Sequence, residues 1–295
     1  MRTLIVLGAM VLTAAAPPPA KKALTPADIV AKSPLGAWTA IPDDDVMVID
    51  FKGGGRTVVQ LAPRFAPVHV ANVKALARGG YWDGASVYRL QDNYVAQWGL
   101  NESDRPWPAG VVAKPPAEYT RPLKALRIKP LGYPDAYAPA AGFADGWQIA
   151  YSPKAGWANL AHCYGSVGVG RDLSPDTGTG GELYAVIGQG PRALDRNIAL
   201  IGRVIEGIDR FSSLPRGPAP MGFYADRKQD FPIQSIRLAS DMPLAERPLF
   251  EVMDTNSATF ARLLHLKANR KDDFFVRPAG GIDLCSATVP VRKRT

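Results

Sequence analysis

Residues 81–99 read YWDGASVYRLQDNYVAQWG. Two runs rich in β-branched and aromatic residues, at 85–90 and 94–98, flank a short polar break, which predicts a β-hairpin. Arg89 lies in the first run and Gln97 lies in the second. Because side chains paired across two strands share one face of a sheet, we expect the guanidinium and the amide to lie together. A fixed guanidinium beside an aromatic ring suits a site that grips a neutral amide.

The composition favours an all-β or mixed fold over a helical bundle, because 27 prolines and 28 glycines among 295 residues indicate many turns. The chain is long enough to bury a full core. The formal net charge is +8, and the basic residues do not alternate with aromatic ones as they do on nucleic-acid-binding surfaces. We therefore interpret the charge as a solvated surface and expect no nucleic acid partner.

Residues 1–20, MRTLIVLGAMVLTAAAPPPA, have the positive start, apolar run and small-residue end of a secretory signal peptide. The apolar run is shorter than the ~20 residues that a membrane-spanning helix needs, so we expect no stable insertion in a membrane. These features predict an exported protein located in the periplasm. Residues 21–44 are then a linker with a short helix, which follows the N-cap Thr25 and begins at Pro26.

Beyond the linker, the pattern divides into a main domain at 45–239 and a C-terminal appendage at 240–295. The main domain opens with VMVIDF, three glycines and RTVVQL, a hairpin typical of the start of a β-barrel. Apolar residues at helical spacing follow at 67–78. Residues 101–146 are rich in Pro, Ala and Tyr, and we expect an insertion with little regular structure across the barrel surface. The appendage is expected to be a small α+β unit, and no catalytic motif is visible in it.

A second informative stretch, 166–209, carries SVGVGR, LSPDTGTGG, ELYAVI, RALD and ALIGRVIEGID in that order. Together with SVYRL and YVAQWG upstream, this order and spacing resemble the cyclophilin family of peptidyl-prolyl cis-trans isomerases. The resemblance covers about residues 46–239. It implies a mainly β fold: a closed, eight-stranded antiparallel barrel capped by two helices, followed here by the appendage.

The resemblance also implies a catalytic pair and a substrate pocket. Arg89 falls on the family's catalytic arginine, and Gln97 falls on the glutamine that holds this arginine. The positions that match substrate-binding residues are Tyr94, Val95, Gly170, Glu182, Tyr184 and Leu194. The departures from the family pattern are Glu182 in place of a glutamine, Ala193 in place of a tryptophan and Ile198 in place of a histidine.

These residues predict peptidyl-prolyl cis-trans isomerase activity on X-Pro bonds of exported proteins as they fold. We expect proline-containing, unfolded or partly folded polypeptides as partners, and a monomer. We expect no cofactor or metal, since His69, His162 and His265 lack ligand spacing. The alternative is a prolyl-peptide-binding module or holdase chaperone with weakened catalysis. This alternative would hold if Glu182 forms an ion pair with Arg89 and so occupies the hydrogen-bond donor that the substrate needs.

The two cysteines leave two interpretations open. In an exported protein, Cys163 and Cys285 could form a disulfide that ties the appendage to the main domain. The other interpretation is two buried free thiols. Closing such a long loop with a disulfide would contribute about 4 kcal/mol in the chain-entropy model.

Overall fold

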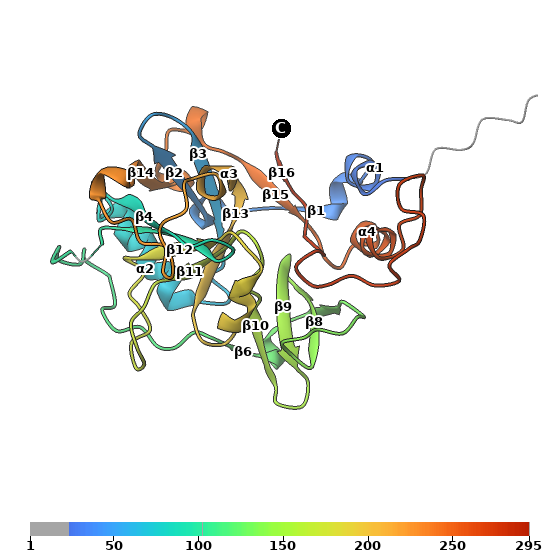
Figure 1. The fold of residues 1–295 in the computed structure, drawn as a ribbon. Coiled ribbons are helices and arrows are strands. Elements are labelled where there is room, and N and C mark those ends of the chain that lie inside the picture. Colours follow the sequence, from blue (N-terminus) through green and yellow to red (C-terminus); the bar gives the residue numbers. More distant parts are fainter. Residues whose placement is uncertain (1–23, 102, 295) are drawn as a thin grey trace, which may run out of the picture.

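The computed structural model describes residues 24–101 and 103–294, and its centre is a closed antiparallel β-barrel (Figure 1). Neighbouring strands pair in antiparallel register, and β11 closes the circle by pairing with β13. The predicted eight-stranded barrel is therefore confirmed. In order around the barrel, the strands are β11 (Ser166–Val169), β12 (Leu183–Val186), β5 (Val95–Gly99), β4 (Ser86–Leu90), β14 (Phe231–Leu238), β2 (Val46–Phe51), β3 (Arg56–Leu61) and β13 (Leu200–Glu206).

Two helices pack against the barrel core. The first, α2 (Pro67–Arg78), carries apolar residues at helical spacing, so they lie on one face and are buried together. These side chains are Val70, Val73 and Leu76. The second, α3 (Asp209–Ser212), is only four residues long, and its Phe211 stacks on the buried ring of Trp98.

The insertion is more regular than expected, so this part of the prediction is wrong. Residues 101–146 contribute three strands to a five-stranded sheet. Its strands, in order, are β6 (Arg121–Pro122), β10 (Trp157–Leu160), β9 (Trp147–Ser152), β8 (Ala140–Ala144) and β7 (Ile128–Pro130). The reason is the two-residue turn between β8 and β9, where Asp145 and Gly146 both have positive φ, 50° and 82°. A type I′ hairpin turn requires these angles, and an Asp-Gly pair adopts them readily.

The C-terminal appendage forms one module with the N-terminal residues of the described chain, and the term is used below for this whole module. Its elements are α1 (Pro26–Ala31), β1 (Trp38–Ala40), β15 (Phe250–Met253), α4 (Ala258–Ala268) and β16 (Val291–Lys293). β15 pairs with β1 on one side and β16 on the other, and Figure 1 shows α1 beside α4. Residues 24–44 are thus part of this α+β module rather than the expected linker, because their apolar side chains share its core. The predicted signal peptide, residues 1–20, lies outside the described residues.

A disulfide joins the appendage to the rest of the chain. Cys163, shortly after the end of β10, is bonded to Cys285 across 122 residues of sequence, so the structure has the disulfide rather than two free thiols. None of the helices in the described ranges has the length and apolar character that crossing a membrane requires.

Candidate active site

A pocket of about 270 Å³ lies on the barrel where β4, β5 and β12 are neighbours. The residues that line it are Arg89, Gln91, Tyr94, Val95, Tyr184, Leu194, Ile198 and Met221. Five of them, Arg89, Tyr94, Val95, Tyr184 and Leu194, are residues that the sequence placed in a site. The strand register explains this convergence, because Gln97 of β5 lies opposite both Arg89 of β4 and Tyr184 of β12.

The guanidinium of Arg89 is held by three neutral acceptors. Its Nη1 donates to Gln97 Oε1 at 2.9 Å and its Nη2 donates to Gln91 Oε1 at 2.6 Å. Its Nε donates to the carbonyl of Met221 at 2.7 Å, and the Phe223 ring lies 4.9 Å from Cζ. Burial lowers the pKa of Arg89, but an arginine stays protonated at neutral pH. Three of its five N–H groups are thus bonded, which leaves one on each Nη for a ligand.

A chain of hydrogen bonds behind Arg89 fixes the orientation of Gln97. Gln97 Nε2 donates to the Tyr88 hydroxyl at 2.5 Å, and this hydroxyl donates to Glu182 Oε2 at 2.6 Å. Because the Gln97 amide nitrogen faces Tyr88, its oxygen must face Arg89. The β-strand register shifts between Val87 and Arg89, and such a bulge lets two consecutive side chains reach the same partner.

Glu182, which the family resemblance places among the substrate-binding residues, does not line this pocket. Its Oε1 accepts hydrogen bonds from the backbone amides of Leu100 and Asn101, both at 3.0 Å, while Oε2 accepts from Tyr88. Burial raises the pKa of this carboxyl above its ordinary value, although these hydrogen bonds oppose the shift. Burial and the nearby Glu182 likewise raise the pKa of Tyr88. The ion pair with Arg89, on which the holdase alternative depended, is not formed between these two described residues.

Gly170 is also absent from the lining, contrary to expectation. It lies directly behind the pair, where an added Cβ would be 3.4 Å from Gln97 Nε2 and 3.0 Å from the Cβ of Glu182. Its amide donates to the carbonyl of Glu182 at 2.7 Å. Gly170 therefore leaves room for the side chains that orient Arg89 instead of contacting a ligand in this pocket.

The apolar half of the pocket rests on a buried polar chain. The hydroxyl of Tyr184 points away from the pocket and bonds to His162 Nε2 at 3.0 Å, and His162 Nδ1 bonds to Asp195 Oδ1 at 2.9 Å. This chain is satisfied when Nδ1 carries the imidazole proton. Gly168 makes space for it, since an added Cβ there would lie 2.3 Å from the Tyr184 hydroxyl oxygen. Burial raises the pKa of Tyr184 well above its ordinary value.

Asp195 anchors the end of this chain. Its Oδ2 accepts from Arg192 Nε at 2.9 Å, and Arg192 also forms a bidentate pair with Asp135, at 2.9 and 2.8 Å. Burial alone would raise the pKa of Asp195, but the hydrogen bonds from His162 and the charge of Arg192 hold it below its ordinary value. Tyr184 is thereby held in one position under the pocket.

A family model described as "Cyclophilin type peptidyl-prolyl cis-trans isomerase/CLD" matches residues 46–239, well over half of the chain. The chain belongs to the cyclophilin family. It is a peptidyl-prolyl cis-trans isomerase. Proteins from Brucella suis and Brucella melitensis, each named "Probable peptidyl-prolyl cis-trans isomerase", are 24% identical to it over 202 residues, which is 67% of this chain and 86% of theirs. The crystal structure of cyclophilin AquaCyp293 from Hirschia baltica has the same fold, with a TM-score of 0.67 and 23% identity over 92% of this chain and 98% of that one.

Sequence reasoning missed one wall of this cyclophilin's pocket, the loop that carries Met221 and Phe223. The loop is held along β4, because Leu90 exchanges backbone hydrogen bonds with Gly222 and Gly217. Gly222 has a φ of +76°, and an added Cβ there would lie 2.6 Å from the Leu90 carbonyl. No local signal could have found this contact, since 132 residues separate Arg89 from Met221.

The departures from the family pattern affect the cyclophilin's pocket unequally. Ile198 lines it and adds an apolar side chain beside Leu194. Ala193 is exposed and does not line it. Gln91, which also went unnoticed, lies in the polar break of the hairpin and reaches back to Arg89. The wall is therefore altered, while the Arg89–Gln97 pair is intact.

Proposed function

We propose that Arg89 is the catalytic donor of this isomerase, and that Gln97 is its positioning residue. Resonance gives the X-Pro C–N bond partial double-bond character and a rotation barrier of about 18–20 kcal/mol. Rotation breaks this resonance, so the proline nitrogen acquires a lone pair only in the twisted state. A donor aimed at that nitrogen binds the transition state better than either planar ground state, which is what accelerates a reaction.

The observation that carries the proposal is the set of bonds that hold Arg89. All three acceptors are neutral, so none of these bonds cancels the charge, and among the described residues one N–H on each Nη is left for a ligand. A guanidinium also keeps its donors in a rigid plane. Gln97, itself fixed through Tyr88, determines where that plane lies.

The apolar residues of the pocket hold the proline ring while the preceding acyl group turns. Tyr94, Val95 and Ile198 pack with Tyr184 and Leu194 in one cluster beside the guanidinium. Because the Tyr184 hydroxyl is bonded to His162, this side chain presents only its ring to the ligand. An apolar ring is therefore matched on one side and a charged donor is offered on the other.

The expected rate increase requires both the Arg89 guanidinium and the apolar residues of the pocket. A rate increase of about 10⁵ corresponds to lowering the barrier by about 7 kcal/mol. One hydrogen bond from a charged group contributes only about 1.5–3 kcal/mol. The remainder must come from holding the ring and from fixed, partly desolvated dipoles around the rotating bond.

We further propose that the substrates are proline-containing, unfolded or partly folded exported proteins, and that the enzyme acts as a monomer in the periplasm. The sequence of residues 1–20 supports export. The disulfide between Cys163 and Cys285 supports an oxidising compartment, since such bonds persist mainly there. No observation favours the holdase alternative, because Glu182 is engaged by Tyr88 and the backbone.

The location can be tested with a reporter that is active only where disulfides form. Alkaline phosphatase fused after Thr295 of the full chain should be active in a Gram-negative host, and the fusion should lose its first residues. Deleting residues 2–16 should abolish both effects. An unprocessed, inactive fusion would contradict export while leaving the isomerase assignment untouched.

A further inference from the structure

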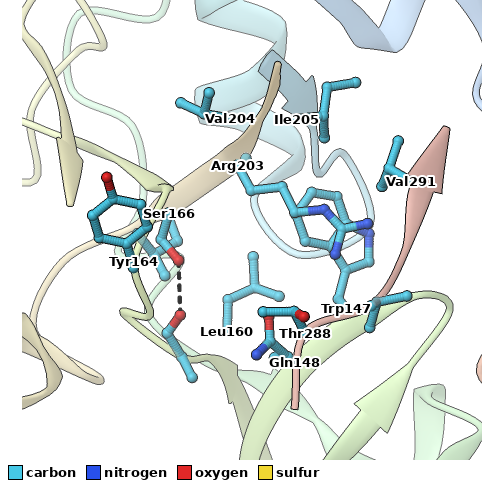
Figure 2. A pocket seen from close by; sticks show the side chains of 14 residues that line it. Trp147, Gln148, Leu160, Tyr164, Ser166, Arg203, Val204, Ile205, Thr288 and Val291 are labelled. Atoms are coloured by element: carbon cyan, nitrogen blue, oxygen red, sulfur yellow. Dashed lines mark hydrogen bonds between the residues drawn. The ribbon is translucent and has the colours of Figure 1, made fainter. Parts of the chain in front are cut away.

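A second cavity, of about 190 Å³, lies where the barrel, the five-stranded sheet and the C-terminal segment meet (Figure 2). β13 and β11 form one side, β9 and β10 form another, and Thr288 and Val291 close it from the appendage. It shares no lining residue with the Arg89 pocket. Its lining is therefore separate from that of the proposed active site.

Arg203 is the only charged residue among the fourteen that line this cavity. Its Nε and Nη2 donate to Gln60 Oε1 at 3.1 and 2.8 Å, and its Nη1 donates to the carbonyl of Gly146 at 2.9 Å. Both acceptors are neutral, and the structure records no carboxylate bonded to Arg203 within its described ranges. One N–H on Nη1 and one on Nη2 therefore have no acceptor among these residues. Burial lowers the pKa of Arg203 to about 10, so it still carries its charge at neutral pH.

Arg192, a buried arginine elsewhere in the chain, has the carboxylate partners that are expected of a purely structural arginine. Arg192 is bonded to both Asp135 and Asp195, so its charge is balanced. Leaving a charge in a partly desolvated site without an opposite charge is costly, and the missing partner has to be supplied from outside the chain to remove that cost. Arg203 thus presents an unfilled position for an anion.

The other side chains of the cavity define the rest of the ligand. Arg203 Cζ lies 4.6 Å from the centre of the Trp147 ring, and Figure 2 shows this side chain reaching toward Trp147, with Val291 nearby. Leu160 and Val204 add further apolar surface. Gln148 and Ser166, two of the polar residues in the lining, already donate to the backbone carbonyls of Leu284 and Ala161. The cavity is smaller than the ~300–1,000 Å³ typical of sites for drug-sized ligands.

We propose that this cavity binds a small organic carboxylate with an apolar body, whose carboxylate bonds to Arg203 and whose body packs against Trp147. A carboxylate has two oxygens that match the planar fork of a guanidinium, and such paired, charge-assisted bonds are stronger than bonds between neutral groups. An apolar body fits the remaining walls.

The test uses 3-phenylpropionate and its neutral isostere 3-phenylpropionamide, each titrated into the full, oxidised chain by calorimetry. The carboxylate should bind at least about tenfold more tightly than the amide, because only the carboxylate gains charge-assisted bonds. Arg203→Lys should reduce this preference, since it keeps a charge but loses the fork that binds both carboxylate oxygens. Arg210→Lys, at an exposed arginine outside both pockets, should leave it unchanged.

Two further variants locate the binding. Thr288→Trp places a large ring at the exposed rim of the cavity and should abolish binding even if Arg203→Lys fails to fold. Arg89→Ala should leave the affinity unchanged, because the Arg89 pocket is separate. Equal affinity for acid and amide would overturn the proposal. So would binding that survives Thr288→Trp, or binding that is lost in Arg89→Ala.

Discussion

Two strand arginines of this cyclophilin are each held by neutral acceptors, but in different surroundings. Arg89 pairs in register with Gln97 on the next strand, and Arg203 pairs in register with Gln60. Each also donates to a backbone carbonyl and lies over an aromatic ring, Phe223 in the first case and Trp147 in the second. Neither has its charge cancelled by a carboxylate within the described ranges, so both keep it for a ligand.

What differs is what fixes the glutamine and what lies beside the guanidinium. Gln97 is oriented through Tyr88 by a buried carboxylate, and an apolar pocket shaped for a ring lies next to Arg89. Arg203 instead connects β3 with the turn before β9 and faces a smaller cavity closed by the appendage. A guanidinium that is bonded only to neutral acceptors keeps its charge available for a ligand, and its surroundings decide whether the site rotates an amide or only binds.

Reducing the disulfide should have the largest effect on stability. It should weaken binding at the Arg203 cavity but leave isomerase activity at the Arg89 pocket unchanged. Because the bond closes a loop across 122 residues, its loss should lower the free energy of unfolding by about 4 kcal/mol. Urea unfolding with and without a reductant measures this. The Cys163→Ser/Cys285→Ser variant should match the reduced protein and should bind 3-phenylpropionate less tightly, while keeping its isomerase activity well below the unfolding temperature. An unchanged urea midpoint would show that the bond does not stabilise the module.

Arg89→Ala and Arg203→Ala form the second test, because they remove matching groups from the two sites. Arg89→Ala should lower kcat/KM for an X-Pro peptide by about 10- to 100-fold, which corresponds to losing one charged hydrogen bond in the transition state. Arg203→Ala should change it by less than about twofold, since Arg203 does not line the Arg89 pocket. A protease-coupled assay measures both. Equal losses in the two variants would contradict the assignment of the active site.

The Tyr184→Phe variant tests whether the hydrogen bond between Tyr184 and His162 stabilises the apolar half of the Arg89 site. The variant keeps the ring but leaves His162 Nε2 without its partner, so the free energy of unfolding should fall by about 1–3 kcal/mol. Tyr94→Phe, at a half-buried tyrosine of the same pocket, is the matched control and should cost less than about 0.5 kcal/mol. Denaturant midpoints compare them. If both variants are equally stable, the chain from Tyr184 to Asp195 does not support the pocket.

Glu182→Gln should have the smallest effect, a fall in kcat/KM of about three- to tenfold, about 1 kcal/mol. Glutamine has one acceptor oxygen, so it cannot accept from Tyr88 and from both backbone amides as Glu182 does. Tyr88 would then turn to Gln97 for an acceptor, and Gln97 would lose its fixed orientation. Unchanged or higher turnover would show that this chain does not position Arg89.

The same chain predicts a dependence on pH. The pKa of Glu182 is raised above its ordinary 4.5, so acidification protonates this carboxyl earlier than an exposed one. Protonation neutralises the carboxylate that accepts the hydrogen bond from Tyr88. We therefore expect kcat/KM to fall as the pH is lowered, with the midpoint of this decrease above pH 4.5. In Glu182→Gln this decrease should be absent. A decrease that persists in that variant would assign the titration to another group.

The barrel and the Arg89–Gln97 pair were predictable because they depend on short-range patterns. The runs around 85–98 form a hairpin, and a register across two strands then brings the pair together. The insertion sheet was missed although its Asp145-Gly146 turn was visible, since a Pro- and Ala-rich composition hid strands that are short. Local composition is therefore a poor guide where strands of two or three residues pair.

Other features could not be deduced from sequence because they depend on tertiary contacts. The position of Glu182 follows from a bulge at Tyr88, and the position of Met221 follows from a loop laid along a distant strand. The N-terminal residues looked like a linker because their partners, β15 and α4, come some two hundred residues later. His162 gave no sign of its role, since Tyr184 and Asp195 meet it only in the folded barrel.

We propose that the Arg89 fork acts on the rotating amide rather than on binding the peptide. Exchange NMR on an Ala-Pro peptide tests it, since cis–trans exchange and peptide affinity are measured in one titration. Wild type should accelerate exchange, whereas Arg89→Lys should bind within about threefold of wild type but lose at least about tenfold of the acceleration, because lysine lacks the rigid fork. Equal acceleration by Arg89→Lys, or loss of affinity in place of acceleration, would show that the fork does not act on the rotating amide.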